Sequence, residues 1–170
     1  MEERKKSSDT VGSESCDTFD RPFDFVEEGK TALVCEPDNA VLENLGAVLE
    51  KMGYHVTKST AGPDSLESMK FHLYDLLVVG ESCDSQGSDE DGVLDYIRQL
   101  PMGVRRNIFV VLLSTTVRTM DNMAAFGRSV NLIINMKNIG QVEAIIKRGL
   151  ADNEAFYATF REALKKAGRL

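Results

Sequence analysis

A chain of 170 residues with 42% hydrophobic and 28% charged residues has the size and composition of one globular domain plus some additional chain. No apolar run approaches the roughly 20 residues that a membrane-spanning helix needs. The charged N-terminus has no apolar segment behind it, which argues against a signal peptide. We therefore expect a cytoplasmic protein that does not associate with a membrane.

Charge is unevenly distributed along the chain. Residues 1–97 carry 22 acidic and 8 basic residues, a net charge of −14, whereas residues 98–170 carry 5 and 12, a net charge of +7. Such polarity can steer a protein partner or favour head-to-tail self-association, and it can equally reflect solvated faces alone. The basic half lacks a helix-turn-helix or an aromatic platform, so nucleic-acid binding is not expected.

The three cysteines, Cys16, Cys35 and Cys83, are odd in number and have no metal-ligand spacing. In a cytoplasmic protein this pattern favours reduced thiols over a disulfide framework. We expect Cys35 to be a buried residue of a strand and Cys83 to be the more exposed thiol of a loop. A redox switch between Cys35 and Cys83 is a minor alternative.

Residues 1–30, rich in Ser, Asp, Glu and Lys and without periodicity, predict a flexible tail. Three aromatic residues, Phe19, Phe23 and Phe25, interrupt it. We expect them to dock on the chain's own surface rather than on a partner.

From Thr31 onward, apolar runs alternate with amphipathic helical patterns. The predicted strands are residues 31–36, 54–59, 75–80, 107–114 and 131–135. The predicted helices run from Asp38 or Asn39 to Met52, from Pro63 to Leu73, over 93–100, around Met120 to Ala124, over 139–150 and over 152–167. We expect Leu73 to point inward from the second of these helices. This order predicts an α/β fold with a five-stranded, doubly wound parallel sheet and an extra C-terminal helix.

The segment DLLVVG, residues 75–80, is the strand on which the functional interpretation depends. Four consecutive apolar residues between Asp75 and Gly80 are typical of a strand buried on both faces. Functional groups of open α/β sheets lie beyond the carboxyl ends of such strands. Here that end is Gly80, which has no functional group.

Residues 31–150 resemble the receiver domain of bacterial two-component response regulators. LVCEPDN resembles its first strand and acidic turn, LEKMGYHV its first helix end and second strand, YDLLVVG its third strand, DGVLDYIRQL its third helix and FVVLLST its fourth strand. The resemblance implies a receiver-like domain over 31–150, between a tail (1–30) and a C-terminal helical extension (151–170).

The resemblance also assigns functional positions, and most of them are altered. The acidic pair that would hold Mg²⁺ falls on Glu36 and Pro37, and proline supplies no side-chain oxygen. The phosphoacceptor position falls on Gly80, which cannot form an acyl phosphate. The conserved hydroxyl of the family is kept as Ser114, whereas its lysine is replaced by Asn135.

These changes predict a degenerate phosphorylation pocket formed by Glu36, Asp38, Gly80, Ser114 and Asn135, with no catalytic residue, metal or cofactor. The chain would then be a pseudo-receiver: a non-enzymatic signalling or scaffold module that acts through phosphorylation-independent protein–protein interaction. Two alternatives remain. The emptied pocket could bind a small molecule or ion, or Glu81 or Asp84 could serve as a shifted acceptor in a true phosphorelay.

The resemblance further implies a surface for a protein partner or a second copy of the chain, built from residues 118–150 and the helix 152–167. The candidate residues of this interaction face are Met123, Phe126, Ile133, Ile139, Val142, Phe156 and Phe160. We expect the apolar stripe of the last helix to pack on the helix before it, in preference to forming a dimer seam.

Overall fold

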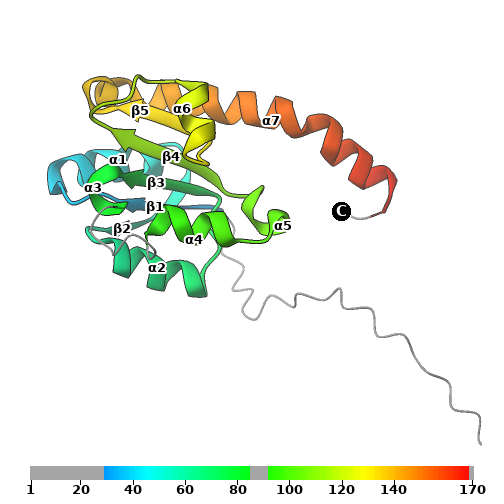
Figure 1. The fold of residues 1–170 in the computed structure, drawn as a ribbon, viewed down its shortest axis with the longest axis horizontal. Coiled ribbons are helices and arrows are strands. Elements are labelled where there is room, and N and C mark those ends of the chain that lie inside the picture. The colour runs from blue at the N-terminus through cyan, green and yellow to red at the C-terminus, as the bar shows by residue number, and fades with distance from the viewer. Residues whose placement is uncertain (1–28, 85–91, 169–170) are drawn as a thin grey trace, which may run out of the picture.

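The structure, a computed structural model, describes residues 29–84 and 92–168, which form a three-layer α/β fold (Figure 1). A five-stranded parallel sheet with strand order β2-β1-β3-β4-β5 is the middle layer. The strands are β1 (Lys30–Cys35), β2 (Tyr54–Ser59), β3 (Leu76–Gly80), β4 (Phe109–Ser114) and β5 (Leu132–Asn135). The predicted doubly wound sheet is confirmed, as is the additional helical segment at its C-terminal end.

Helices connect consecutive strands and cover both faces of the sheet. In chain order they are α1 (Asn39–Lys51), α2 (Gly62–Phe71), α3 (Glu81–Asp84), α4 (Val93–Gln99), α5 (Met102–Arg105), α6 (Asn122–Gly127), the 3₁₀ helix η1 (Met136–Gln141) and α7 (Val142–Lys166). No helix in the described part of the chain is both long and apolar enough to cross a membrane.

Helix α1 begins and ends where its sequence predicts. The carboxylate of Asp38 accepts the N–H groups of Ala40, at 2.8 Å, and Val41, at 3.4 Å, which satisfies donors that the first turn of a helix leaves free. After the helix, Gly53 has a φ of +90°, a conformation that only glycine adopts readily. The chain can therefore turn directly into β2.

The core consists of two clusters, one on each face of the sheet, because alternate residues of a strand point to opposite faces. In β3 every residue is buried: Leu77 and Val79 face α2 and α4, whereas Leu76 and Val78 face α1 and α7. This double burial explains the continuous apolar run in the sequence. It also fixes the register of β3 between β1 and β4.

The parallel register brings the carboxyl ends of four strands to one edge of the sheet. Cys35 lies opposite Val79, Gly80 opposite Leu113, and Ser114 opposite Asn135. The residues that follow these ends are therefore neighbours in space, although they are far apart in the sequence.

Three local expectations are wrong. The polar segment after β3 begins with a helical turn, α3, instead of a loop. Leu73, expected to point inward from the second helix, follows the end of α2 and is 53% exposed. The two helices predicted for residues 139–150 and 152–167 are one helix, α7, of 25 residues, and Ile139 belongs to the preceding η1.

Helix α7 contacts the sheet only through its first part. Its buried residues are Val142, Ile146 and Gly149, and the remainder extends beyond the sheet (Figure 1). A Cβ atom at Gly149 would lie 3.0 Å from Leu132 and 3.1 Å from Phe109, so glycine allows α7 to approach the strands closely at this point. Because Asp152 lies within this continuous helix, it does not begin a new one.

Several expectations concern residues outside the described ranges. These are the predicted tail up to residue 28, with Cys16 and the aromatic residues Phe19, Phe23 and Phe25, and the acidic segment 85–91.

The anchoring of α7 can be tested by two truncations on the same helix. Ile146→Ala removes a fully buried side chain and should lower the free energy of unfolding by about 3 kcal/mol. Phe156→Ala, at a residue that is 78% exposed, should change it by less than about 0.5 kcal/mol. Urea denaturation of both variants measures the difference. Equal losses would mean that the distal half of α7 is also packed.

Candidate functional site

The five residues of the predicted pocket all lie at or beside the carboxyl edge of the sheet. Glu36 and Asp38 follow β1, Gly80 ends β3, Ser114 ends β4 and Asn135 ends β5. The strand ends thus bring together the side chains that the sequence places at this edge. The contacts that these residues make, described next, were not predicted from the sequence.

The space beside Gly80 is filled by Glu36. A Cβ atom at position 80 would overlap Oε2 of Glu36, and it would lie 3.1 Å from the Cδ atom of that carboxylate. Glu36 is only 7% exposed, and its Oε1 accepts the backbone N–H of Asp38 at 3.3 Å. The glutamate side chain therefore occupies the room that glycine leaves, which disfavours the alternative of an emptied pocket that binds a small molecule or ion.

Burial has an electrostatic consequence for Glu36. Loss of hydration raises the pKa of its carboxyl group above the ordinary value, and the negative charge of Asp38 adds to the increase. The hydrogen bond from the Asp38 N–H opposes it. Asp38 itself caps α1, so its carboxylate already has backbone donors.

The described residues contain no group of three or more His, Cys, Asp or Glu that could hold a metal ion. Two surface hollows in this part of the chain are lined by residues of the 140–147 and 64–72 segments, and neither includes a residue of the predicted pocket.

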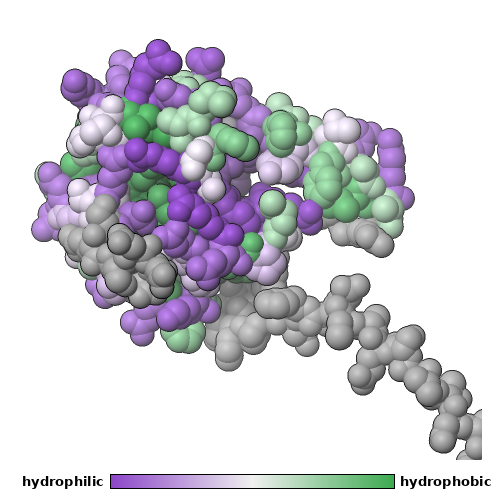
Figure 2. Space-filling model, in the orientation of Figure 1, coloured by the Kyte–Doolittle hydropathy of each residue, from purple (hydrophilic) through white to green (hydrophobic). Residues whose placement is uncertain are grey.

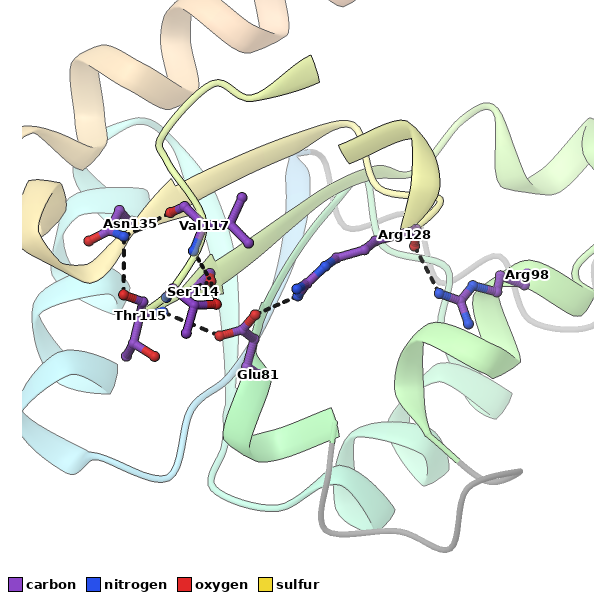
Figure 3. Close-up of polar contacts among 8 residues, drawn as sticks. Glu81, Arg98, Ser114, Thr115, Val117, Arg128 and Asn135 are labelled. Atoms are coloured by element: carbon purple, nitrogen blue, oxygen red, sulfur yellow. Dashed lines mark hydrogen bonds and ion pairs between the residues drawn. The ribbon is translucent and has the colours of Figure 1, made fainter. Parts of the chain in front are cut away.

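Ser114 and Asn135 organise the segment that follows β4. The buried Oγ of Ser114 accepts the N–H groups of Thr116, at 3.1 Å, and Val117, at 2.9 Å. Asn135 donates through Nδ2 to the carbonyl of Val117 at 2.7 Å, and its own N–H donates to Oγ1 of Thr119 at 2.9 Å (Figure 3). Both side chains thus hold backbone, which is a positioning role.

An ion pair between Glu81 and Arg128 lies at the same edge (Figure 3). Glu81 is the first residue of α3, and Arg128 follows α6. The guanidinium group donates to Oε1 of Glu81, and the N–H of Thr115 donates to Oε2 at 3.2 Å. Arg98 donates in turn to the carbonyl of Arg128 at 3.2 Å. The pair links α3, α6, α4 and the segment after β4.

The ion pair keeps Glu81 charged. Burial raises the pKa of its carboxyl group, but the hydrogen bonds from Arg128, Ser114 and Thr115 outweigh this, so the pKa lies below its ordinary value of 4.5. No sequence pattern predicts this pair, because its partners are 47 residues apart.

Cys35 and Cys83 form a disulfide between the end of β1 and α3. Their Cα atoms are 6.2 Å apart, and both side chains are buried, so the expectations of reduced thiols and of an exposed Cys83 are wrong. Cys35 precedes Glu36, and Cys83 lies two residues after Glu81. The bond therefore links the strand end that precedes Glu36 to the helix that begins with Glu81.

The predicted interaction face is only partly a surface. Met123, Phe126 and Phe156 are strongly exposed and Phe160 is 39% exposed, with the Arg106 guanidinium 4.7 Å above its ring. Figure 2 shows apolar surface on the projecting part of α7. Because α7 is continuous, this stripe cannot pack on a preceding helix.

Three other members of that face are not available to a partner. Ile133 and Val142 are buried in the core, so their assignment to the face is wrong. Ile139 is partly buried against the same core cluster as Val142.

No family model and no curated protein matches the sequence. Solved structures do match the fold. A provisionally named response regulator from Chloroflexus aurantiacus has 21% sequence identity and a TM-score of 0.59, covering 73% of this chain and 99% of its own. The BeF3-activated DrrB receiver domain has 17% identity and a TM-score of 0.55, covering 72% and 98%.

A CheY-like response regulator receiver domain from Methylobacillus flagellatus has 20% identity and a TM-score of 0.51, with coverage of 71% and 98%. At these identities the similarity establishes the fold, which is that of the CheY-like receiver. A fold alone does not establish a function, so the chemistry of this chain has to be argued from the residues at the edge of the sheet.

Contact between Glu36 and position 80 gives a stability prediction. Gly80→Ala should lower the free energy of unfolding by about 2 kcal/mol, because the added Cβ must displace a buried carboxylate. The loss should shrink markedly in a Glu36→Ala background. Gly103→Ala in α5 is the matched control: its Cβ would meet nothing within 4 Å, and it should be neutral or slightly stabilising. Additive effects of the Gly80 and Glu36 substitutions in denaturant unfolding would contradict the contact.

Proposed function

We propose that this chain is a non-enzymatic signalling or scaffold module that acts through protein–protein contacts without being phosphorylated. The observation that carries the proposal is the packing of Glu36 against Gly80. The position where the resemblance places an acceptor has no side chain, and a buried carboxylate takes its space.

The polar groups around that position support the same function. Asn135 replaces the expected lysine and is engaged by the backbone after β4, and Ser114 accepts two backbone N–H groups. Side chains that already hydrogen-bond a loop are not free to bind a phosphoryl group on a neighbouring residue. These side chains therefore support a structural role for the site, in which they hold the segment after β4 in place.

A shifted acceptor is less well supported. Glu81 is held by Arg128 and Thr115, and Oδ1 of Asp84 accepts the N–H of Leu94 at 3.0 Å at the start of α4. A small-molecule sensor is also less well supported, since the room beside Gly80 is filled. We further propose a cytoplasmic location and a protein partner. On the charge and sequence patterns given above, we expect neither nucleic acid nor a membrane to be the partner.

The exposed aromatic end of α7 is the proposed contact surface, together with Met123 and Phe126 of α6. Large exposed apolar side chains are the residues most often buried by a partner. The acidic first half and basic second half of the chain favour a second copy as the partner, because opposite charges attract in a head-to-tail arrangement.

Absence of phosphorylation can be tested by mass. The full chain, incubated with Mg²⁺ and acetyl phosphate, should keep its intact mass. The variants Glu81→Gln and Asp84→Asn, treated in parallel, identify the acceptor if a phosphate adduct does appear. A stoichiometric adduct on the natural chain that one of these variants abolishes would replace the proposal with a working phosphorelay.

Self-association can be tested by sedimentation velocity over a range of protein concentrations. We expect the natural chain to associate, Phe156→Ser to weaken the dissociation constant about tenfold, and added salt to weaken it further. Phe71→Ser is the matched control, because Phe71 is similarly exposed but lies on α2. A chain that stays monomeric at every concentration would rule out a second copy as the partner.

A further inference from the structure

We propose that Cys35 and Cys83 form a reversible thiol–disulfide site, and that its redox state determines whether α3 holds Glu81 against Arg128. The disulfide joins the last residue of β1 to the third residue of α3 across 48 positions of sequence. This proposal does not depend on the identity of a partner or on the absence of phosphorylation.

Helix α3 depends on its links to the rest of the fold. It has only four residues, and a helix of one turn has no stability of its own in water. Its polar links are the Glu81–Arg128 pair, with side chains 27% and 39% exposed, the bonds from Ser114 and Thr115 to Glu81, and the bond from the Leu94 N–H to Asp84. Partly exposed ion pairs contribute little. Apart from the chain connection at Gly80, the covalent bond from Cys35 is therefore the strongest constraint on α3.

Loss of that bond would act directly on the site. Without it, Glu81 keeps its bonds from Arg128, Thr115 and Ser114, residues that remain anchored at the sheet by β4 and α6. Movement of α3 would separate the carboxylate from these donors. The segment after β4 and the C-terminal end of α6 would then lose a shared anchor.

The chemistry of the site is thiol–disulfide exchange. In the reducing direction, the thiolate of a dithiol attacks one sulfur, forms a mixed disulfide and releases the other cysteine as a thiolate. The second thiol of the reductant then completes its own disulfide, and both cysteines end as thiols, having gained two electrons and two protons. A low-molecular-weight disulfide as oxidant reverses the two steps. In a reducing cytoplasm, such bonds are usually transient and regulatory.

Burial makes the exchange conditional on the position of α3. Cys35 and Cys83 are almost fully buried, and the Cys83 carbonyl packs so closely on α2 that a Cβ atom at Gly62 would lie 2.8 Å from it. A reductant can reach the sulfur atoms only after α3 moves away from α2. Any contact that holds α3 in place will therefore also protect the disulfide.

The first test counts free thiols in the full, natively folded chain. Samples equilibrated with oxidised or with reduced dithiothreitol are alkylated, and intact mass gives the number of labels among the 3 cysteines. We expect one label after oxidation, on Cys16, and three after reduction, with peptide mapping assigning them. Three labels in both samples, or one label in both, would overturn the proposal, because the pair would then be permanently open or permanently closed.

The second test measures the structural effect by hydrogen exchange of the same two samples. Reduction should accelerate exchange about tenfold or more at residues 81–84 and at the amides of Thr115 and Leu94, which donate to side chains of α3. Amides of β4 in the core should not change. Cys35→Ala/Cys83→Ala should behave as the reduced chain in either buffer, and Cys16→Ser as the natural chain. Equal protection of α3 in the oxidised and reduced natural chain would refute the coupling, even if the variant fails to fold.

Discussion

The close approach of the Glu36 carboxylate to the backbone of Gly80 determines what the carboxyl edge of this sheet can hold. Parallel pairing of β1 with β3 brings the two positions together, and any side chain at 80 would compete with Glu36 for the same space. A buried acid here is costly in hydration, so its tolerance depends on the Asp38 N–H and on the absent side chain. The neighbouring side chains of Ser114 and Asn135 hydrogen-bond the backbone of the segment after β4.

Most of the fold could be predicted from the sequence because strands buried on both faces leave unbroken apolar runs, as in Leu76 to Val79. The failures occurred where no periodic signal exists. A four-residue helix such as α3 is too short to show one, and an Asp152 that can cap a helix can equally lie inside one. Leu73 was assigned inward by extending a helical pattern past the residue where α2 ends.

Only part of the candidate site could be predicted from the sequence. The clustering of Glu36, Gly80, Ser114 and Asn135 could be inferred because parallel strands end at one edge. The contacts that these residues make could not be inferred, because they depend on side-chain geometry: the glutamate turns into the space beside Gly80, and the asparagine hydrogen-bonds the backbone. Pairs made by tertiary folding leave no spacing rule in a single sequence. Glu81 with Arg128 was not predicted, and Cys35 with Cys83 was named only as a minor alternative to reduced thiols.

The continuity of α7 has a mechanical consequence. The buried residues of the helix end at Gly149, and about 17 residues, or roughly 25 Å of helix, follow as a lever arm. Surface contacts, such as Asn131 with Asn153 and Arg106 with Phe160, tie this part to the rest of the fold. A tilt of about 10° at its root would displace the tip by about 4 Å. Small repacking around Ile146 would thus be amplified at the aromatic residues near the tip, so the outer end of the helix can report on the state of the core from which it extends.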